Sequence, residues 1–374
     1  KYSGTAPGKV ILFGEHAVVY NKMAIASSLN LRARTDIEIK NDENKLLRIE
    51  MPEGEKIELE RIKVEQIFVN KLKTIKEDDI QLISEIVEEI ENYIKNREIK
   101  GDLEVAVVCI LYIHGIVNHF TTNNQYKNSS IHIKLSTELP MGAGLGSSAS
   151  FAVSLVSAFI AAMYNWKDES LEDKQLEMIN NWAFIVEKII HGTPSGIDNT
   201  VATYGGLLTK EGTVRTKVQN ASACNILIVN TKIPKNTKKL VAGVRERYND
   251  PKTGEKMKEY INAIDELTKK SLSIMTSTPF DEIQLTQLIQ QNHKLLNYIG
   301  VGHEKLDLIV EIAKKYNLSA KLTGAGGGGC GFIYLPQDQP DAPQGLLDEL
   351  NKENFWYKAT KVGAGGVKIE ILTN

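Results

Sequence analysis

The alternation of apolar and polar residues divides the chain into strands and helices. The apolar run at residues 10–13 is typical of a buried strand, which Gly14 ends. The pattern predicts further strands over residues 29–39, 46–59, 131–135, 205–208, 226–230, 332–335 and 367–372, with a polar turn at 41–44.

Apolar residues at helical spacing predict the remaining elements. Within residues 61–100, one apolar stripe predicts an amphipathic helix; it consists of Ile80, Ile83, Val87, Ile90 and Ile94. A more buried helix is predicted over 105–120, followed by a polar loop at 121–130. Other helices are predicted over residues 151–160, 176–190, 257–275, 283–299, 305–316 and 346–351. The basic run at 232–247 is predicted to be a solvated face.

Length and composition narrow the class of protein. A chain of 374 residues suggests two domains or more. A net charge of −2 argues against a nucleic-acid partner. The most apolar run, at residues 105–113, is too short for a membrane span, so no membrane partner is expected. Three cysteines without metal-ligand spacing fit a reducing compartment, and a cytoplasmic location is expected.

Residues 138–149 form a glycine-rich segment between a predicted strand and a predicted helix. Glycines let a backbone approach an anion, and the first N–H groups of a helix point at it, so a phosphate site is predicted. Ser147 and Ser148 are expected to cap the helix, and one of them to reach a phosphate-bound Mg²⁺. The alternative is a glycine turn that only lets the helix pack closely.

Two common phosphate loops do not fit this segment. No Lys precedes Ser147 or Ser148, as a Walker A loop requires. Residues 144–149 match the dinucleotide pattern G-x-G-x-x-A, but a polar connection at 166–173 follows where a second strand should stand.

Charged residues elsewhere suggest a catalytic cleft. Lys9 precedes a buried strand, and Glu15 and His16 follow it; the alternative is a surface Lys and an ordinary turn. Glu187 lies in an apolar helix end, and Asp198 follows a turn. Buried carboxylates need a metal or a Lys as partner, and Asp198 is the best candidate general base. The alternative is a helix-end Glu and a capping Asp.

A second glycine cluster spans residues 321–331 and leads into a predicted strand. Four consecutive glycines, 326–329, are entropically costly unless their N–H groups close on a ligand, so an anion nest is predicted. A flexible linker is the alternative. Cys330 is expected to be a small apolar residue, because no basic residue adjoins it.

The ordered set of the Lys9–His16 segment and the two glycine loops resembles the GHMP kinases. Within that family, APGKVILFGEHAVVY and HGTPSGIDN are most similar to the mevalonate kinases of eukaryotes. The resemblance implies an α+β fold of two domains, 1–228 and 229–374, with ATP in the cleft between them. It also implies transfer of the γ-phosphoryl group of ATP to the C5 hydroxyl of mevalonate.

The resemblance further assigns roles to single residues. It implies nucleotide contacts from Lys9, Thr137, Gly142, Ala143, Gly144, Leu145, Gly146, Ser147, Ser148, Gly326 and Gly327. Ser148 and Glu187 would hold Mg²⁺, and Asp198 would take the proton of the substrate hydroxyl while Lys9 stabilises negative charge. Glu15, His16 and Asp198 would face mevalonate. Thr137 stands where relatives often carry Ser, and Glu53 where some carry Asn.

Other functions remain open on the sequence. A GHMP kinase for another small alcohol, such as phosphomevalonate, would keep every loop. A non-catalytic sensor of the same fold and a nicotinamide-dependent oxidoreductase are the other candidates. The family resemblance also implies a homodimer. Because backbone donors recognise phosphates whatever carries them, a prenyl diphosphate is a candidate inhibitor that competes with ATP.

Overall fold

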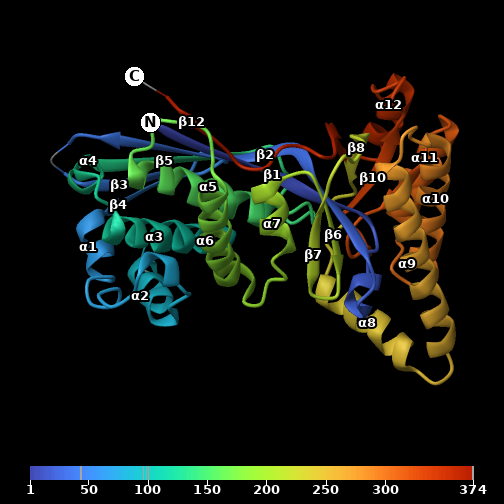
Figure 1. Ribbon diagram of the computed structural model, residues 1–374, viewed down its shortest axis with the longest axis horizontal. Coiled ribbons are helices and arrows are strands. Elements are labelled where there is room, and N and C mark those ends of the chain that lie inside the picture. The colour runs from blue at the N-terminus through green and yellow to red at the C-terminus, as the bar shows by residue number, and fades with distance from the viewer. Residues whose placement is uncertain (43, 96, 98, 100, 373–374) are drawn as a thin grey trace.

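The computed structural model describes residues 1–372 apart from 43, 96, 98 and 100, and consists of two sheets with helices packed against each (Figure 1). The first sheet contains β1 (Tyr2–Phe13), β2 (Ala24–Lys40), β3 (Leu46–Glu50), β4 (Lys56–Glu60), β5 (Ser130–Thr137), β6 (Leu207–Glu211), β7 (Val214–Val218) and β12 (Lys368–Ile371). Its strand order is β12-β1-β2-β5-β3-β4, with β6 paired to β2 and β7 to β6. All its pairs are antiparallel except β3–β5. The predicted α+β class is confirmed.

The second sheet has four antiparallel strands in the order β11-β8-β10-β9. They are β8 (Asn225–Asn230), β9 (Ala320–Leu322), β10 (Cys330–Leu335) and β11 (Trp356–Lys361). The predicted boundary at residue 228 falls inside β8, and β12 returns from the second half of the chain to pair with β1. The two ends of the described chain therefore lie side by side, with the N-terminal amine of Lys1 donating to the carbonyl of Leu372 at 3.1 Å.

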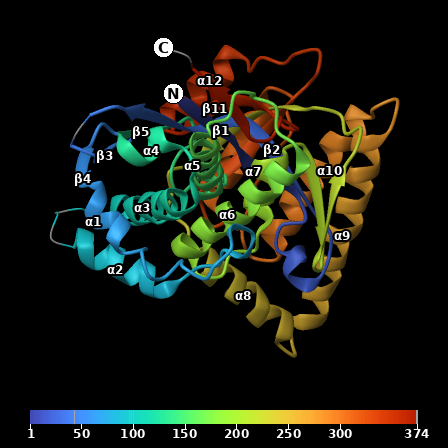
Figure 2. The same ribbon diagram turned by 60° about the vertical axis from the view of Figure 1, so that its left-hand side comes forward.

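One face of the first sheet is covered by a helical layer that contains α5 (Figure 2). The elements of this half are η1 (Ala17–Tyr20), α1 (Arg61–Gln66), η2 (Glu77–Asp79), α2 (Ser84–Ile94), α3 (Asp102–Phe120), α4 (Asn124–Asn128), α5 (Ser147–Tyr164), α6 (Asp173–His191) and α7 (Ile197–Tyr204). Helix α5 packs on β1 and β2 and touches α3, α6 and α7. By length and composition α3 and α5 could each cross a membrane, but most of both is buried inside the fold, as in a core helix. The sequence argument against a membrane span used only the apolar run at residues 105–113. Helix α3 is longer than that run.

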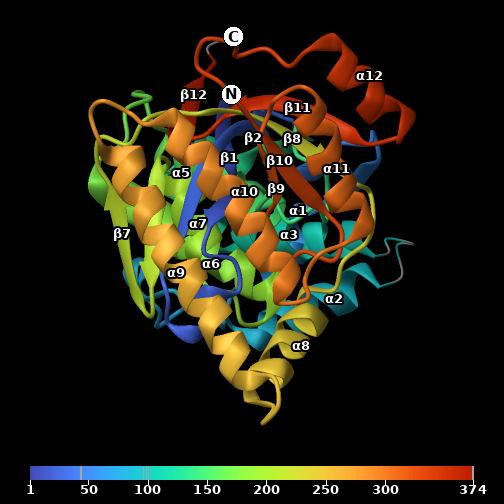
Figure 3. The same ribbon diagram turned by 90° about the vertical axis from the view of Figure 1, so that its right-hand side faces the viewer.

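The second sheet is covered by long helices on one side (Figure 3). The helices of this half are α8 (Thr237–Asn249), α9 (Gly254–Thr276), α10 (Glu282–Tyr298), α11 (Glu304–Lys315) and α12 (Gln344–Lys352). Helices α10 and α11 lie against β9, at the start of the second glycine loop. The helices predicted here from apolar stripes are present with small shifts of their ends.

Three local predictions were wrong. The strand predicted over residues 46–59 is the hairpin β3–β4, whose turn is closed by Gly54 N–H donating to Met51 O at 3.0 Å. Ile80 and Ile83 precede α2, whose buried positions are Ile86, Ile90 and Ile94. The predicted loop at 121–130 contains α4, because the Asn123 side chain accepts from two backbone N–H groups and starts a helix. Residue 43 of the predicted turn and residues 96, 98 and 100 of the predicted helical stretch lie outside the described part.

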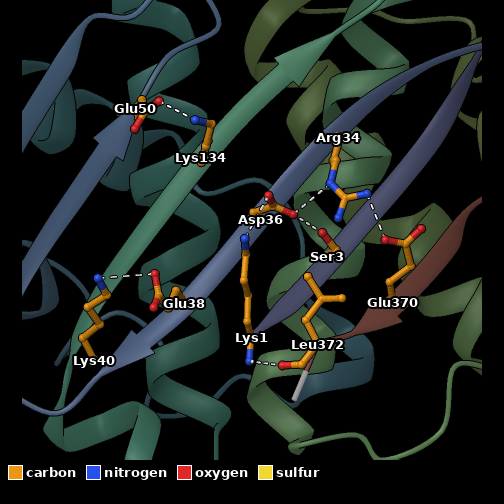
Figure 4. Close-up of polar contacts among 10 residues, drawn as sticks. All are labelled: Lys1, Ser3, Arg34, Asp36, Glu38, Lys40, Glu50, Lys134, Glu370 and Leu372. Atoms are coloured by element: carbon orange, nitrogen blue, oxygen red, sulfur yellow. Dashed lines mark hydrogen bonds and ion pairs between the residues drawn. The ribbon is translucent and has the colours of Figure 1, made fainter. Parts of the chain in front are cut away.

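The opposite face of the first sheet is polar and carries ion pairs (Figure 4). Lys1 pairs with Asp36 at 3.4 Å, Arg34 with Glu370 at 2.9 Å, and Lys134 with Glu50 at 2.7 Å. A hollow of about 420 Å³ lies over this face. Because its charged groups are largely paired with one another at the surface, they contribute little stability and leave little free charge for a ligand.

A buried ion pair joins the two sheets. Lys321 of β9 donates to Glu15, just after β1, and to the carbonyl of Leu12 at 2.9 Å; both charged side chains are fully buried. Burial raises the pKa of the Glu15 carboxyl and lowers that of the Lys321 amine, while their mutual attraction opposes both shifts. Thr323 Oγ1 adds a hydrogen bond to Ile11 O at 2.8 Å.

Replacing Lys321 by Met should destabilise the fold strongly, because the Glu15 charge would stay buried without its partner. We expect a loss of about 3–5 kcal/mol, measured by urea unfolding. The double variant Glu15→Gln/Lys321→Met should lose less stability than the sum of the losses in the two single variants. Lys314→Met, on the exposed side of α11, is the surface control and should change stability by less than about 0.5 kcal/mol. Equal stability of Lys321→Met and this control would contradict the structural role.

Candidate active site

The first glycine loop connects β5 to α5, which is the predicted strand–turn–helix arrangement. Gly142, Gly144 and Gly146 have φ angles of 67°, 81° and 71°, which only glycine adopts at little cost. Between them, Ala143 and Leu145 are buried and anchor the loop in the core. The first N–H groups of α5, which have no acceptor within the helix, follow directly on this anchored loop, as an anion site requires.

The two loop serines differ from their predicted capping role. Helix α5 begins at Ser147, and its N-cap is Gly146, so neither serine caps it. Ser148 Oγ instead lies 3.0 Å from Nε2 of His191, at the end of α6. Thr137, the last residue of β5, accepts from Leu139 N–H at 3.0 Å and so holds the start of the loop.

Lys9 reaches this loop because β1 is irregular beside it. The pairing of β1 with β2 shifts register between Pro7 and Lys9, and Lys9 N–H donates instead to Leu145 O at 2.7 Å. A side chain at Gly8 would meet Leu139 and the Leu145 carbonyl, with a Cβ only 2.6 and 2.8 Å away. The prediction that Lys9 stands at one end of a short strand was wrong; it lies at a bulge within β1.

Lys9 and Asp198 form an ion pair at the mouth of the first loop. Lys9 Nζ lies 3.1 Å from Asp198 Oδ1, with side chains 9% and 34% exposed. Asp198 stands in the first turn of α7, which follows Gly196 with a φ of 73°. The predicted base and the predicted cation are thus brought together from distant parts of the chain.

Glu187 lies near this pair at the end of α6. It is 4% exposed, and its Oε1 has no hydrogen-bond partner among the described residues. Burial and the negative charge of Asp198 raise the pKa of Glu187 to about 7, against the opposing effects of Ser148 and Lys9. An unpartnered buried carboxylate beside a phosphate site is suited to a hard cation that the phosphates also bind.

Glu15 and His16, the predicted substrate contacts, are both buried. Lys321 pairs with Oε1 of Glu15, whereas the buried Oε2 has no hydrogen-bond partner among the described residues. His16 Nε2 donates to Ala325 O at 2.8 Å, which links β1 to the second glycine loop, and its buried Nδ1 has no partner among the described residues. Burial lowers the pKa of His16, so the neutral ring is favoured.

The second glycine loop joins β9 to β10 and is packed, not a flexible linker. A Cβ on Gly326 would lie 2.0 Å from Val301 O, and one on Gly328 would lie 2.8 Å from Ile233. Gly327 N–H donates to Val301 O, and Gly329 N–H to Ile233 O. These two N–H groups are therefore already used within the protein and are not free for the predicted anion nest; the nucleotide contacts implied for this loop stay predictions.

Lys235 is a site residue that sequence reasoning missed, since it was placed in a solvated basic run. Its side chain crosses Gly329, and its Nζ would lie 2.4 Å from a Cβ on Gly144 of the first loop. A signal was present, because Lys235 closely follows the buried strand β8 and precedes α8. Strand ends and helix starts are common places for ligand-binding groups.

These features define a nucleotide-dependent small-molecule kinase fold, and the chain belongs to the GHMP kinase family. The family model described as "GHMP kinases N terminal domain" matches residues 112–206, and the model described as "GHMP kinases C terminal" matches residues 280–354. The chain is 36% identical to the mevalonate kinase of Homo sapiens, over 99% of this chain and 95% of the relative. It is 32% identical to that of Arabidopsis thaliana, over 97% and 98%.

Solved structures agree with this family. The crystal structure of the Methanococcus jannaschii mevalonate kinase matches with a TM-score of 0.70 and 27% identity, covering 96% of this chain and 97% of that one. The resemblance drawn from the loops is therefore confirmed. The roles of the single residues stay predictions.

The raised pKa of Glu187 should make the stability of the free protein depend on pH. Between the ordinary value of 4.5 and about 7, folded Glu187 keeps its proton and unfolded Glu187 loses it. The unfolding free energy should therefore fall as pH rises, by about 1.4 kcal/mol per unit and about 3 kcal/mol in all, and level off above pH 7.

Urea unfolding at pH 5, 6, 7 and 8, without nucleotide or metal, measures this effect. Glu187→Gln should remove this pH dependence, so the unfolding free energy of the variant should rise relative to that of the wild type as pH increases. Contributions of groups that do not interact with Glu187 cancel in that difference. Parallel stability curves for the two proteins would show that Glu187 is not the group that titrates.

Proposed function

We propose that the chain is an ATP-dependent kinase that phosphorylates the C5 hydroxyl of mevalonate, giving 5-phosphomevalonate and ADP. This reaction belongs to the mevalonate route to isoprenoids and sterols. Full-length similarity to mevalonate kinases of animals and plants supports the substrate. The observation that carries the proposal is the Lys9–Asp198 pair, 3.1 Å apart beside the first glycine loop.

The geometry suits phosphoryl transfer, in which positioning and charge neutralisation supply most of the catalysis. The backbone donors at the start of α5 bind the phosphates of ATP. Asp198 receives the proton of the alcohol as its oxygen attacks the γ-phosphate. Lys9, already beside Asp198, stabilises the charge that develops on the transferred group.

The residues present fit a Mg²⁺ ion that enters with ATP. No cluster of three His, Cys, Asp or Glu side chains suited to a metal occurs among the described residues. Mg²⁺ in kinases needs only one or two protein ligands, because the nucleotide phosphates and water provide the others. The unpartnered Oε1 of Glu187, with the hydroxyl of Ser148, supplies such a ligand set. Bound there, Mg²⁺ would neutralise phosphate charge.

A cytoplasmic location and a homodimer complete the proposal. The three cysteines, Cys109, Cys224 and Cys330, are all buried and free, which supports a reducing compartment. The dimer rests on the family resemblance.

A coupled assay that follows ADP release tests the function. The purified protein with ATP and Mg²⁺ should turn over mevalonate, and should consume one ATP for each mevalonate. Phosphomevalonate, homoserine and galactose are the comparison substrates. Preferred turnover of any of these three would replace the proposed substrate.

Asp198→Asn is the matched control for that assay, because it keeps the shape of the side chain and removes the base. We expect kcat to fall by about 10²- to 10⁴-fold, with ATP binding little changed. A near-normal kcat in this variant would assign Asp198 a structural role.

We also propose that farnesyl or geranylgeranyl diphosphate inhibits by occupying the phosphate site. The glycine-loop donors recognise a diphosphate without regard to the group attached to it. Inhibition should be competitive with ATP and not with mevalonate, in steady-state assays that vary each substrate in turn. Competition against mevalonate alone would refute a shared phosphate site.

A further inference from the structure

The backbone around Lys235 is fixed to the second glycine loop. Thr231 donates to Gly329 O through both its N–H and its Oγ1, each at 2.9 Å. In return, Gly329 N–H donates to Ile233 O at 3.0 Å. The segment that leads from β8 to Lys235 is thus hydrogen-bonded to Gly329, the loop residue against which the Lys235 side chain lies.

The Lys235 side chain occupies space that three glycines leave open. A Cβ on Gly329 would lie 2.8 to 2.9 Å from its Nζ, Cδ and Cε atoms. A Cβ on Gly144 would lie 2.4 Å from Nζ, and one on Gly324 would lie 3.5 Å from it. The ammonium group therefore sits where the first and second glycine loops approach each other.

The charge of Lys235 is unbalanced in the free protein. Across the described residues, no hydrogen bond or ion pair involves its Nζ, whereas Lys9 is paired with Asp198 at 3.1 Å. Burial lowers the pKa of Lys235, and the like charge of Lys9 adds to that shift. A cation partly withdrawn from water without a counter-charge costs free energy until an anion binds beside it.

We infer that Lys235 binds the polyphosphate of the nucleotide where the two glycine loops meet, as a second active-site cation. This inference rests on the proposed function, since the nucleotide is ATP. Lys9 and Lys235 then have different tasks. Lys9 acts at the base and at the transferred group, because it is paired with Asp198. Lys235 serves the phosphates, because it lies against Gly144 of the phosphate loop.

The test compares three variants. Lys235→Met removes the charge and keeps the bulk, Lys235→Arg keeps the charge, and Lys239→Met removes an exposed charge from α8 as the control. Calorimetry measures the binding of ATP and of inorganic tripolyphosphate without turnover. Lys235→Met should weaken both by about 10- to 100-fold, as expected for one charged hydrogen bond. Lys235→Arg should restore most of the affinity, and Lys239→Met should leave it unchanged.

Two further measurements separate this role from others. The free Lys235→Met protein should be at least as stable to urea as the wild type, because the lost cation had no partner; a structural role predicts a loss. The KM for mevalonate should change less than about 2-fold. A large rise in that KM with normal tripolyphosphate binding would instead assign Lys235 to the substrate carboxylate, and would overturn the inference.

The binding measurements also distinguish a failure of the proposed function from a failure of the role inferred for Lys235. A wild-type protein that binds ATP and tripolyphosphate but does not phosphorylate mevalonate would contradict the proposed function alone. Wild-type affinity for both ligands in Lys235→Met would contradict only the role of Lys235. An equal loss in Lys235→Arg and Lys235→Met would show that the shape of Lys235, and not its charge, matters.

Discussion

The arrangement of the cleft depends on the buried Lys321–Glu15 pair. It ties β9 of the second sheet to the end of β1 in the first, at a point with no access to water. The hydrogen bonds from Thr323 to Ile11 and from His16 to Ala325 fix the same junction. Burying such a pair costs desolvation free energy, and separating the two charges inside the protein would cost more. The pair therefore favours one relative position of the two halves. The two glycine loops, each rooted in one half, inherit their separation from it.

Charge in the cleft is arranged around missing partners. Lys9 and Asp198 balance each other, whereas Glu187 Oε1 has no hydrogen-bond partner among the described residues and only His191, at 4.0 Å, as a candidate counter-charge; no ion pair of the described residues involves Lys235. Their pKa values are shifted in the directions that reduce this cost, upward for Glu187 and downward for Lys235. A complex of a divalent cation with a polyphosphate supplies a positive partner to the first and a negative partner to the second. Under the proposed function, the charges of the free site are therefore complementary to those of the metal–nucleotide complex.

Sequence reasoning located the elements whose signal is local. The first glycine loop, α5 and the long helices of the second half follow from periodicity and turn residues within short windows. It could not find partners that lie far away in the chain. Lys321, near the other end of the chain, pairs with Oε1 of Glu15, while the substrate contact that the resemblance implies for Glu15 stays a prediction. Lys235 stood among other basic residues, and only the fold places Gly144 and Gly329 against it.

The packing of the second glycine loop shifts phosphate recognition toward the first loop and Lys235. The N–H group of Gly327 donates to Val301 O and that of Gly329 to Ile233 O. Because neither residue has a side chain, Leu240 fits against Gly327 and Lys235 against Gly329. The glycines there act mainly as spacers that let a lysine reach the phosphates from the second half of the chain. A cation delivered this way binds phosphate only while the two halves keep their relative position. Affinity for ATP is therefore coupled, through Lys235, to the same junction that Lys321 and Glu15 hold together.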